Sequence, residues 1–178
     1  MKKFLIVVDM QKDFVDGALG TKEAVAIVEG VAEKIRSFEG EIFVTYDTHY
    51  EDYLDTAEGK SLPVPHCIEG TEGWQLDKKV LAALQGKAYT DVEKFTFGSV
   101  DLPNLIAEAA GEEEFSIELV GLCTDICVVS NALILKATSP EIKVSVDASC
   151  CAGVTPESHL AALTTMKMCQ VEVIDSSQ

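Results

Sequence analysis

The stretch IELVGLCTDICVVSNALI, residues 117–134, joins a strand to a helix. Its first part is a nearly continuous apolar run of strand length, and the expected helix begins near Cys127, after the polar turn. A strand that passes directly into a helix is the repeating unit of α/β folds. The stretch therefore predicts that class of fold.

The same alternation extends to both ends of the chain. Several runs, such as LIVV at residues 5–8, are continuously apolar, which is typical of central strands covered on both faces. We predict strands at Phe4–Asp9, Glu41–Asp47, Ala88–Val92, Ser116–Cys123, Lys143–Ala148 and Val171–Ile174. Helices are expected at Lys22–Ser37, Leu76–Leu84, Leu102–Ala110, Cys127–Ala137 and Pro156–Met168. The prediction is one Rossmann-like α/β domain over residues 1–178, with three α/β/α layers and a central, mainly parallel six-stranded sheet.

The composition excludes several kinds of partner. The chain carries 30 Asp and Glu against 14 Lys and Arg, a formal net charge of −16. Nucleic acid and anionic membranes are polyanions, so neither is expected to bind. No apolar run reaches the roughly 18 residues of a membrane span, and the apolar start ends at Asp9 with no cleavage site directly after it. We therefore expect a cytoplasmic protein.

The cysteines are expected to be free and mostly buried. There is no CxxC pair, and a chain this long and rich in aliphatic residues does not need disulfides. Cys127 stands apart because a helix N-terminus lowers a thiol pKa, and the free backbone N–H groups there can hold an oxyanion. It is either a nucleophile or a small buried residue of the turn. Burial alone is the expectation for Cys123, Cys150, Cys151 and Cys169.

Further polar residues follow the predicted strands, where α/β folds place their sites. Asp9 closes an apolar strand, so it is either paired or used, or it caps the next turn. Lys94, flanked by Phe95 and Phe97, is either an exposed loop lysine or a desolvated one that has a lowered pKa or fixes an anion.

A set of possible metal ligands begins at the end of the second strand. Asp47 and His49 are followed by Glu58 and His66 in the long irregular stretch from Thr48 to Gly73. Imidazole and carboxylate groups suit zinc, iron or manganese. The spacing is not that of a tight metal motif, so surface histidines remain the alternative.

Three of these segments together resemble a known family. Asp9 in VVDMQKDF, Lys94 in EKFTFGS and Cys127 in GLCTDICV resemble the Asp-Lys-Cys triad of the isochorismatase-like cysteine hydrolases. Asp47-x-His49 followed by Pro65-His66-Cys67 resembles the nicotinamidase/pyrazinamidase branch. The resemblance extends over the whole chain and implies the isochorismatase-like hydrolase fold.

The resemblance implies a role for each triad residue. Cys127 would attack a carboxamide carbon, Asp9 would take the thiol proton and deliver one to ammonia, and Lys94 would hold the ion pair and help lower the thiol pKa. Water would then hydrolyse the thioester. The backbone amides of Cys123 and Cys127 would form the oxyanion hole, next to a cis peptide bond between Leu122 and Cys123.

The resemblance also implies a metal ion and a substrate pocket. Asp47, His49 and His66 match the family's metal ligands, and the ion, zinc first, would orient the pyridine ring. The spacing favours Glu58 as the remaining ligand, with Asp52 and Asp55 as rivals. Phe14 resembles the aromatic residue that packs on the ring. Pro63 replaces an aromatic residue found in some relatives, so Leu62 or Phe97 is expected to line the pocket instead.

The predicted function is hydrolysis of nicotinamide to nicotinate and ammonia, by a protein that relatives suggest is a homo-oligomer. The nearest alternative is a related hydrolase for another small amide or a carbamoyl or ureido compound. Isochorismatase itself is disfavoured, because that branch replaces the cysteine that is present here as Cys127. A non-catalytic thiol- or metal-binding protein is the alternative of another class.

Overall fold

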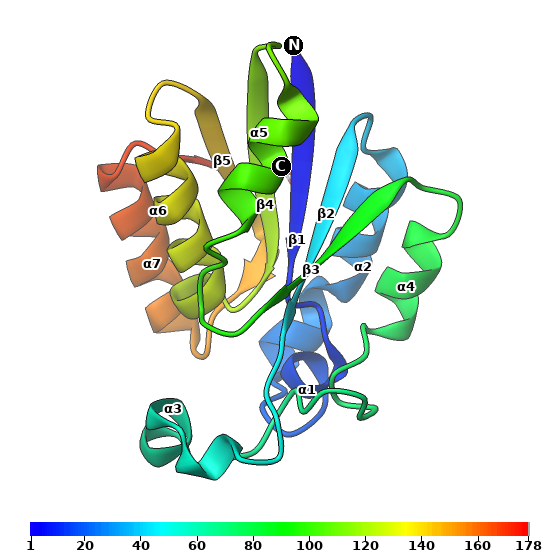
Figure 1. Ribbon diagram of the computed structural model, residues 1–178, viewed down its shortest axis with the longest axis vertical. Helices are drawn as coiled ribbons and strands as arrows, with labels where there is room; N and C mark the ends of the chain where they lie inside the picture. The colour runs from blue at the N-terminus through cyan, green and yellow to red at the C-terminus, as the bar shows by residue number, and fades with distance from the viewer. Residues whose placement is uncertain (178) are drawn as a thin grey trace.

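A parallel sheet forms the centre of the molecule. The computed structural model describes residues 1–177, and in that part the strand order is β3-β2-β1-β4-β5-β6 with every pairing parallel (Figure 1). The strands are β1 (Lys2–Val8), β2 (Glu41–Asp47), β3 (Tyr89–Lys94), β4 (Phe115–Leu122), β5 (Lys143–Ala152) and β6 (Glu172–Ile174). The predicted six-stranded α/β fold is confirmed. The strand order reverses between β1 and β4, which is where sites form in such sheets.

Helices cover both faces of this sheet (Figure 1). One face packs against α1 (Lys12–Val15), α2 (Lys22–Ser37) and α4 (Lys78–Leu84). The other packs against α5 (Leu102–Ala110), α6 (Val129–Thr138) and α7 (Pro156–Met168). In β1, Leu5 and Val7 enter the first core, whereas Phe4, Ile6 and Val8 enter the second. This two-sided burial explains the continuous apolar run.

The predicted helix at Cys127–Ala137 is wrong at its start. A π-helical turn, η2 (Thr124–Val128), precedes α6, so Cys127 lies inside a helical turn. The carbonyl oxygen of Cys123 accepts hydrogen bonds from the backbone N–H groups of both Ile126 and Val128, at 3.1 and 3.0 Å. This shared acceptor widens the turn, and the apolar pattern gave no sign of it.

Other boundaries also differ from the predictions. Asp9 and Cys123 lie just beyond their strands, β6 begins one residue later than predicted, and the helix expected from Leu76 begins at Lys78 because Asp77 caps it. Strand β3 extends to Lys94, and β5 continues to Ala152 because it pairs again with β4 beyond an irregularity. The stretch expected to be irregular contains η1 (Tyr53–Asp55) and α3 (Ala57–Ser61).

Within residues 1–177, none of the helices combines the length and the apolar character needed to cross a membrane.

Candidate active site

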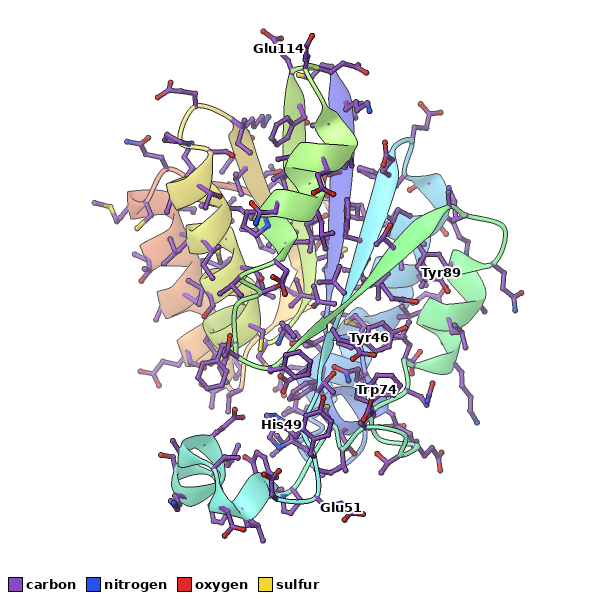
Figure 2. All side chains as sticks on the ribbon, viewed as in Figure 1. Tyr46, His49, Glu51, Trp74, Tyr89 and Glu114 are labelled. Atoms are coloured by element: carbon purple, nitrogen blue, oxygen red, sulfur yellow. The ribbon has the colours of Figure 1, made fainter. Side chains whose placement is uncertain are left out.

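The carboxyl ends of four neighbouring strands bring the polar residues together. Asp9 follows β1, Asp47 ends β2, Lys94 ends β3, and the turn that carries Cys127 follows β4. In a parallel sheet these ends share one edge. Figure 2 shows His49 at this edge, with Tyr46 and Trp74 close by. Residues predicted separately from the sequence therefore form one cluster.

Lys94 is the centre of this cluster. Its Nζ atom lies 2.7 Å from Asp9 Oδ2 and 3.4 Å from both Cys127 Sγ and Asp47 Oδ1, and it donates a hydrogen bond to the Thr96 carbonyl oxygen at 3.1 Å. Asp9, Lys94 and Cys127 are each at most 3% exposed. Of the two alternatives for Lys94, the exposed loop lysine is wrong. The side chain is buried at the end of a strand, between the Asp9 carboxylate and the Cys127 thiol.

The charges around Lys94 correct two expectations. Burial alone would lower the pKa of Lys94, but Asp9, Cys127 and Asp47 outweigh it, so its pKa is raised and the ammonium persists. The pKa of the Cys127 thiol is well above its ordinary value, because burial and the charge of Asp9 outweigh Lys94. Neither a lowered lysine pKa nor a lowered thiol pKa is found. Burial likewise raises the pKa of Asp9 against the lowering effect of Lys94.

Four side chains beside the triad have the chemistry of a metal site. His49 Nε2 lies 3.1 Å from Asp47 Oδ2 and 3.6 Å from Glu58 Oε1, and His66 Nε2 lies 3.6 Å from each of the same two oxygens. The four donor atoms all lie within 4.8 Å of one another. Ligands about 2.1 Å from a tetrahedral zinc ion stand about 3.4 Å apart, so this set fits a divalent ion.

The structure brings Glu58 into this set, whereas its rivals Asp52 and Asp55 are exposed outside it. Burial alone would raise the pKa of Asp47, but hydrogen bonds from His49 and His66 and the charge of Lys94 lower it below the usual range. Asp47 is therefore a charged oxygen donor, as a divalent ion requires.

Neighbouring groups hold the donors in place. The His66 Nδ1 atom lies 2.8 Å from the Val64 carbonyl oxygen, which leaves Nε2 facing the other donors. The Gln11 side chain clamps the backbone of Asp47: its amide donates to the Asp47 carbonyl oxygen and its oxygen accepts from the Asp47 N–H, both at 2.8 Å. Gln11 is fully buried and was not predicted. The signal in the sequence was a polar residue two positions after Asp9, just beyond the apolar strand β1.

Thr45 was missed as well. Its hydroxyl donates a hydrogen bond to Asp9 Oδ1 at 2.6 Å and lies 3.2 Å from the Asp9 backbone nitrogen, which donates to it. The signal in the sequence was a threonine directly after the apolar run IFV of β2, two residues before Asp47.

A cavity of about 780 Å³ opens onto both groups of residues. It reaches Cys127 at one part and Asp47, His49 and Glu58 at another. Apolar side chains form much of its wall: Phe14, Leu19, Leu62, Phe95, Phe97 and Ile126. The three substrate contacts expected from the sequence are among them, whereas Leu19, Phe95 and Ile126 were missed. An apolar wall between a thiol and a metal set suits a small ring.

Cys123 also lines this cavity. Burial raises the pKa of its thiol to about 12, so it stays protonated. The bond between Leu122 and Cys123 is cis, as expected. In the described part of the chain all six cysteines are free and four are buried, whereas Cys123 is half-buried and the expected burial of Cys169 is wrong, because it is exposed at the end of α7. Cys127 is the one in contact with Lys94.

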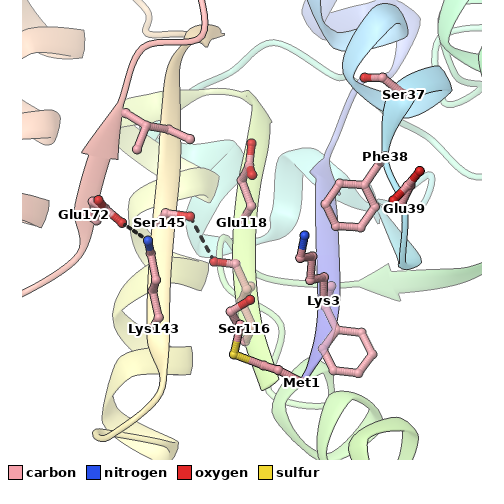
Figure 3. A pocket seen from close by; sticks show the side chains of 13 residues that line it. Met1, Lys3, Ser37, Phe38, Glu39, Ser116, Glu118, Lys143, Ser145 and Glu172 are labelled. Carbon is pink, nitrogen blue, oxygen red and sulfur yellow. Dashed lines mark hydrogen bonds and ion pairs between the residues drawn. The ribbon is translucent and has the colours of Figure 1, made fainter. Parts of the chain in front are cut away.

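A second hollow, of about 440 Å³, lies over the opposite ends of the strands (Figure 3). Its polar groups largely satisfy one another: Lys143 pairs with Glu172 at 2.6 Å, and Ser145 donates to the Ile117 carbonyl oxygen at 3.2 Å. Neither a cysteine nor a histidine is among the described residues that line it. The reactive chemistry is therefore at the other edge of the sheet.

Comparisons with known proteins agree with this geometry. The family model for the isochorismatase domain matches residues 3–178. The nicotinamidase/pyrazinamidase of Mycobacterium tuberculosis is 28% identical over 97% of this chain and 98% of its own length. The crystal structure of the Bacillus subtilis nicotinamidase/pyrazinamidase has a TM-score of 0.84 at 27% identity, covering 98% of this chain and 100% of that one. The pyrazinamidase of Pyrococcus horikoshii in complex with zinc has a TM-score of 0.82 at 27% identity, covering 98% and 99%. The chain belongs to the isochorismatase family.

Proposed function

We propose that this protein hydrolyses nicotinamide to nicotinate and ammonia. The observation that carries the proposal is the position of Lys94, whose Nζ atom contacts both Asp9 and Cys127 at a cavity that also reaches the metal-type donors. The names of the similar proteins support the same substrate. The proposal accounts for a thiol, a carboxylate and an imidazole-carboxylate set within one small site.

The chemistry begins with proton transfer from Cys127 to Asp9. Burial and the charge of Asp9 raise the pKa of the Cys127 thiol, which favours the proton on sulfur, whereas the ion pair with Lys94 favours the charged form of Asp9. As the thiol attacks the carboxamide carbon, Asp9 takes its proton, and Lys94 stabilises the negative charge on either group. Asp9 then delivers that proton to the amide nitrogen, which leaves as ammonia. Water next attacks the thioester with Asp9 again as the base, and the proton returns to the departing Cys127 sulfur as nicotinate is released.

The oxyanion would be held by the backbone N–H groups of Cys123 and Cys127. Both residues line the cavity, on the turn that follows β4. Preorganised amides of this kind stabilise the charge that develops on a carbonyl oxygen during acyl transfer. The Cys123 side chain, which stays a thiol, has no part in this step.

Asp47, His49, Glu58 and His66 would hold one divalent ion, which when bound supplies a positive charge that coordinates and orients the pyridine nitrogen. Zinc is the first choice, because two imidazoles and two carboxylates suit it and a related pyrazinamidase has been solved with zinc. Phe14, Leu62 and Phe97 would contact the ring. We expect a homo-oligomer, which light scattering in solution tests.

The direct test is ammonia release from nicotinamide by the purified protein, with and without added zinc, manganese or iron(II). Metal-dependent release supports the proposal. Absence of release from nicotinamide, together with release from another small amide or ureido compound, would contradict the substrate while leaving the triad chemistry in place.

The metal set is tested by binding. A Cys127→Ala variant, which cannot turn over substrate, is stripped with a chelator and titrated with nicotinamide in a calorimeter. Loss of the orienting ion is expected to weaken binding at least about tenfold, and added zinc should restore it. Equal affinity with and without metal would contradict the role of the four donors.

A further inference from the structure

Thr45 is the one hydroxyl group that contacts the Asp9 carboxylate among the described residues. Its side chain is fully buried, and it is absent from the residues that line the substrate cavity. Thr45 is therefore placed to affect the reaction through Asp9, which it contacts, and not through contact with substrate.

Thr45 forms hydrogen bonds with both the main chain and the side chain of Asp9. Asp9 follows β1 with a positive φ of 46°, a backbone conformation that turns the chain sharply. Its N–H group donates to Thr45 on β2, with the carbonyl oxygen and the hydroxyl oxygen both at 3.2 Å. The hydroxyl in turn donates to Oδ1 at 2.6 Å. Main chain and side chain of Asp9 are thus held by the same threonine.

The two carboxylate oxygens of Asp9 therefore have different partners. Oδ1 accepts the hydrogen bond from Thr45, whereas Oδ2 forms the ion pair with Lys94 at 2.7 Å and has no hydrogen-bond donor among the described residues. Oδ2 is therefore the oxygen available for the thiol proton. We infer that Thr45 is a positioning residue for the proposed hydrolysis, which holds Asp9 in the rotamer that presents Oδ2 to Cys127 and stabilises its charged form.

The inference includes a change in pH dependence, so the other groups facing Asp9 matter. Lys94 on β3 lowers the pKa of Asp9 and Asp47 on β2 raises it. Cys127 on η2, Cys123 and Cys67 are close enough for the charge of Asp9 to raise their own thiol pKa values. A change at Thr45 leaves all of these groups present, so a shift would report the hydroxyl itself.

The test compares Thr45→Val, which keeps the shape and removes the hydroxyl, with Thr45→Ser, which keeps the hydroxyl. Ser145→Ala is the matched control, because it removes a buried strand hydroxyl that donates only to the Ile117 carbonyl oxygen. Each variant is checked by circular dichroism and thermal unfolding. Turnover and the alkylation rate of Cys127 by iodoacetamide, followed by peptide mass spectrometry, are then measured against pH.

In Thr45→Val the Asp9 carboxylate keeps Lys94 but loses its hydroxyl donor, so it becomes easier to protonate. The acid limb of both profiles is expected to move up by about one pH unit, since a hydrogen bond to a charged group contributes about that much. We expect kcat to fall about tenfold while KM stays within about twofold, because Thr45 does not touch substrate. Thr45→Ser should restore both profiles, and Ser145→Ala should match the parent protein.

Two results would overturn the inference. One is an acid limb that stays in place in Thr45→Val, and the other is a Thr45→Ser variant as impaired as Thr45→Val. The alkylation profile needs no substrate, so it decides the matter even where nicotinamide is not hydrolysed. Failure of the proposed substrate and failure of the role of Thr45 are thus separate results.

Discussion

Lys94, which is buried, and Lys34, which is half-buried, each bind two carboxylates. Lys94 contacts Asp9 at 2.7 Å and Asp47 at 3.4 Å, at the carboxyl ends of the strands. Lys34, on α2, contacts Glu118 at 2.7 Å and Asp147 at 2.8 Å, over the middle of β4 and β5. A count of ion pairs does not distinguish the two clusters.

Their carboxylates differ in hydrogen bonding. Asp147 Oδ1 accepts bonds from the Ser149 hydroxyl and N–H and from the Ser176 N–H. Burial alone would raise the pKa of Asp147, but Lys34 and these serine contacts lower it to about 2. Asp9 has one hydroxyl donor, a buried thiol nearby and a raised pKa. A carboxylate with several hydrogen-bond donors and a lowered pKa thus stabilises the fold, whereas one with a single hydroxyl donor and a raised pKa beside a thiol is suited to exchange protons.

The largest difference should come from removing one thiol at each cluster. Cys127→Ala is expected to lower turnover at least about 10⁴-fold, because the proposed nucleophile is removed, and to leave the circular dichroism spectrum unchanged. Cys150→Ala, which removes a buried thiol beside Ser149 in the Lys34 region, should keep turnover within about twofold at a cost of about 1 kcal/mol in stability. Near-normal ammonia release by Cys127→Ala would contradict the assignment of Cys127 as the nucleophile and, with it, the catalytic role of the Lys94 cluster.

Removing each lysine should separate catalysis from stability. Lys94→Met leaves Asp9 and Asp47 without their cation, and turnover is expected to fall at least about 10³-fold. Lys34→Met should leave turnover within about twofold and lower the free energy of unfolding by about 1–2 kcal/mol, since the lysine is partly solvated. Urea unfolding and steady-state kinetics on both variants test this. Equal losses of turnover would mean that the two clusters do not differ in role.

The smallest effect is a pH dependence of stability at the Lys34 cluster. The folded pKa of Asp147, about 2, lies below its ordinary value of 3.8, so its contribution is present above pH 4 and is lost as pH falls through 2. By pH 3 the loss should be about 1 kcal/mol. Urea unfolding at pH 5 and pH 3 should therefore show a steeper decline for the parent protein than for Asp147→Asn. Parallel declines would contradict the shift.

The sequence predicted the architecture because local patterns determine it. Continuous apolar runs with helices between them identified six strands, and the order of Asp9, Lys94 and Cys127 identified the family. The details that depend on contacts between distant segments were not predictable in this way. The extension of β3 to Lys94 depends on pairing with β2, and the widened turn at Cys127 depends on a shared carbonyl acceptor.

The electrostatics of the site were predicted least well. A helix start and a nearby lysine suggested a lowered thiol pKa, but burial and the charge of Asp9 act more strongly in the folded site. No short motif records how deeply a group is buried. Glu58 could be selected by spacing, whereas Thr45 and Gln11 required knowledge of which backbone groups they meet.

Tyr53, in the connection between β2 and β3, contacts both His49 and His66 and the backbone of Leu62. Its buried ring lies 4.7 Å from the His49 ring and 5.1 Å from the His66 ring, and its hydroxyl donates to the Leu62 carbonyl oxygen at 2.8 Å. One buried ring thus contacts both histidines and the backbone of Leu62, whose side chain lines the cavity. Any change at Leu62 that alters the cavity wall is therefore expected to disturb the packing of both histidines as well.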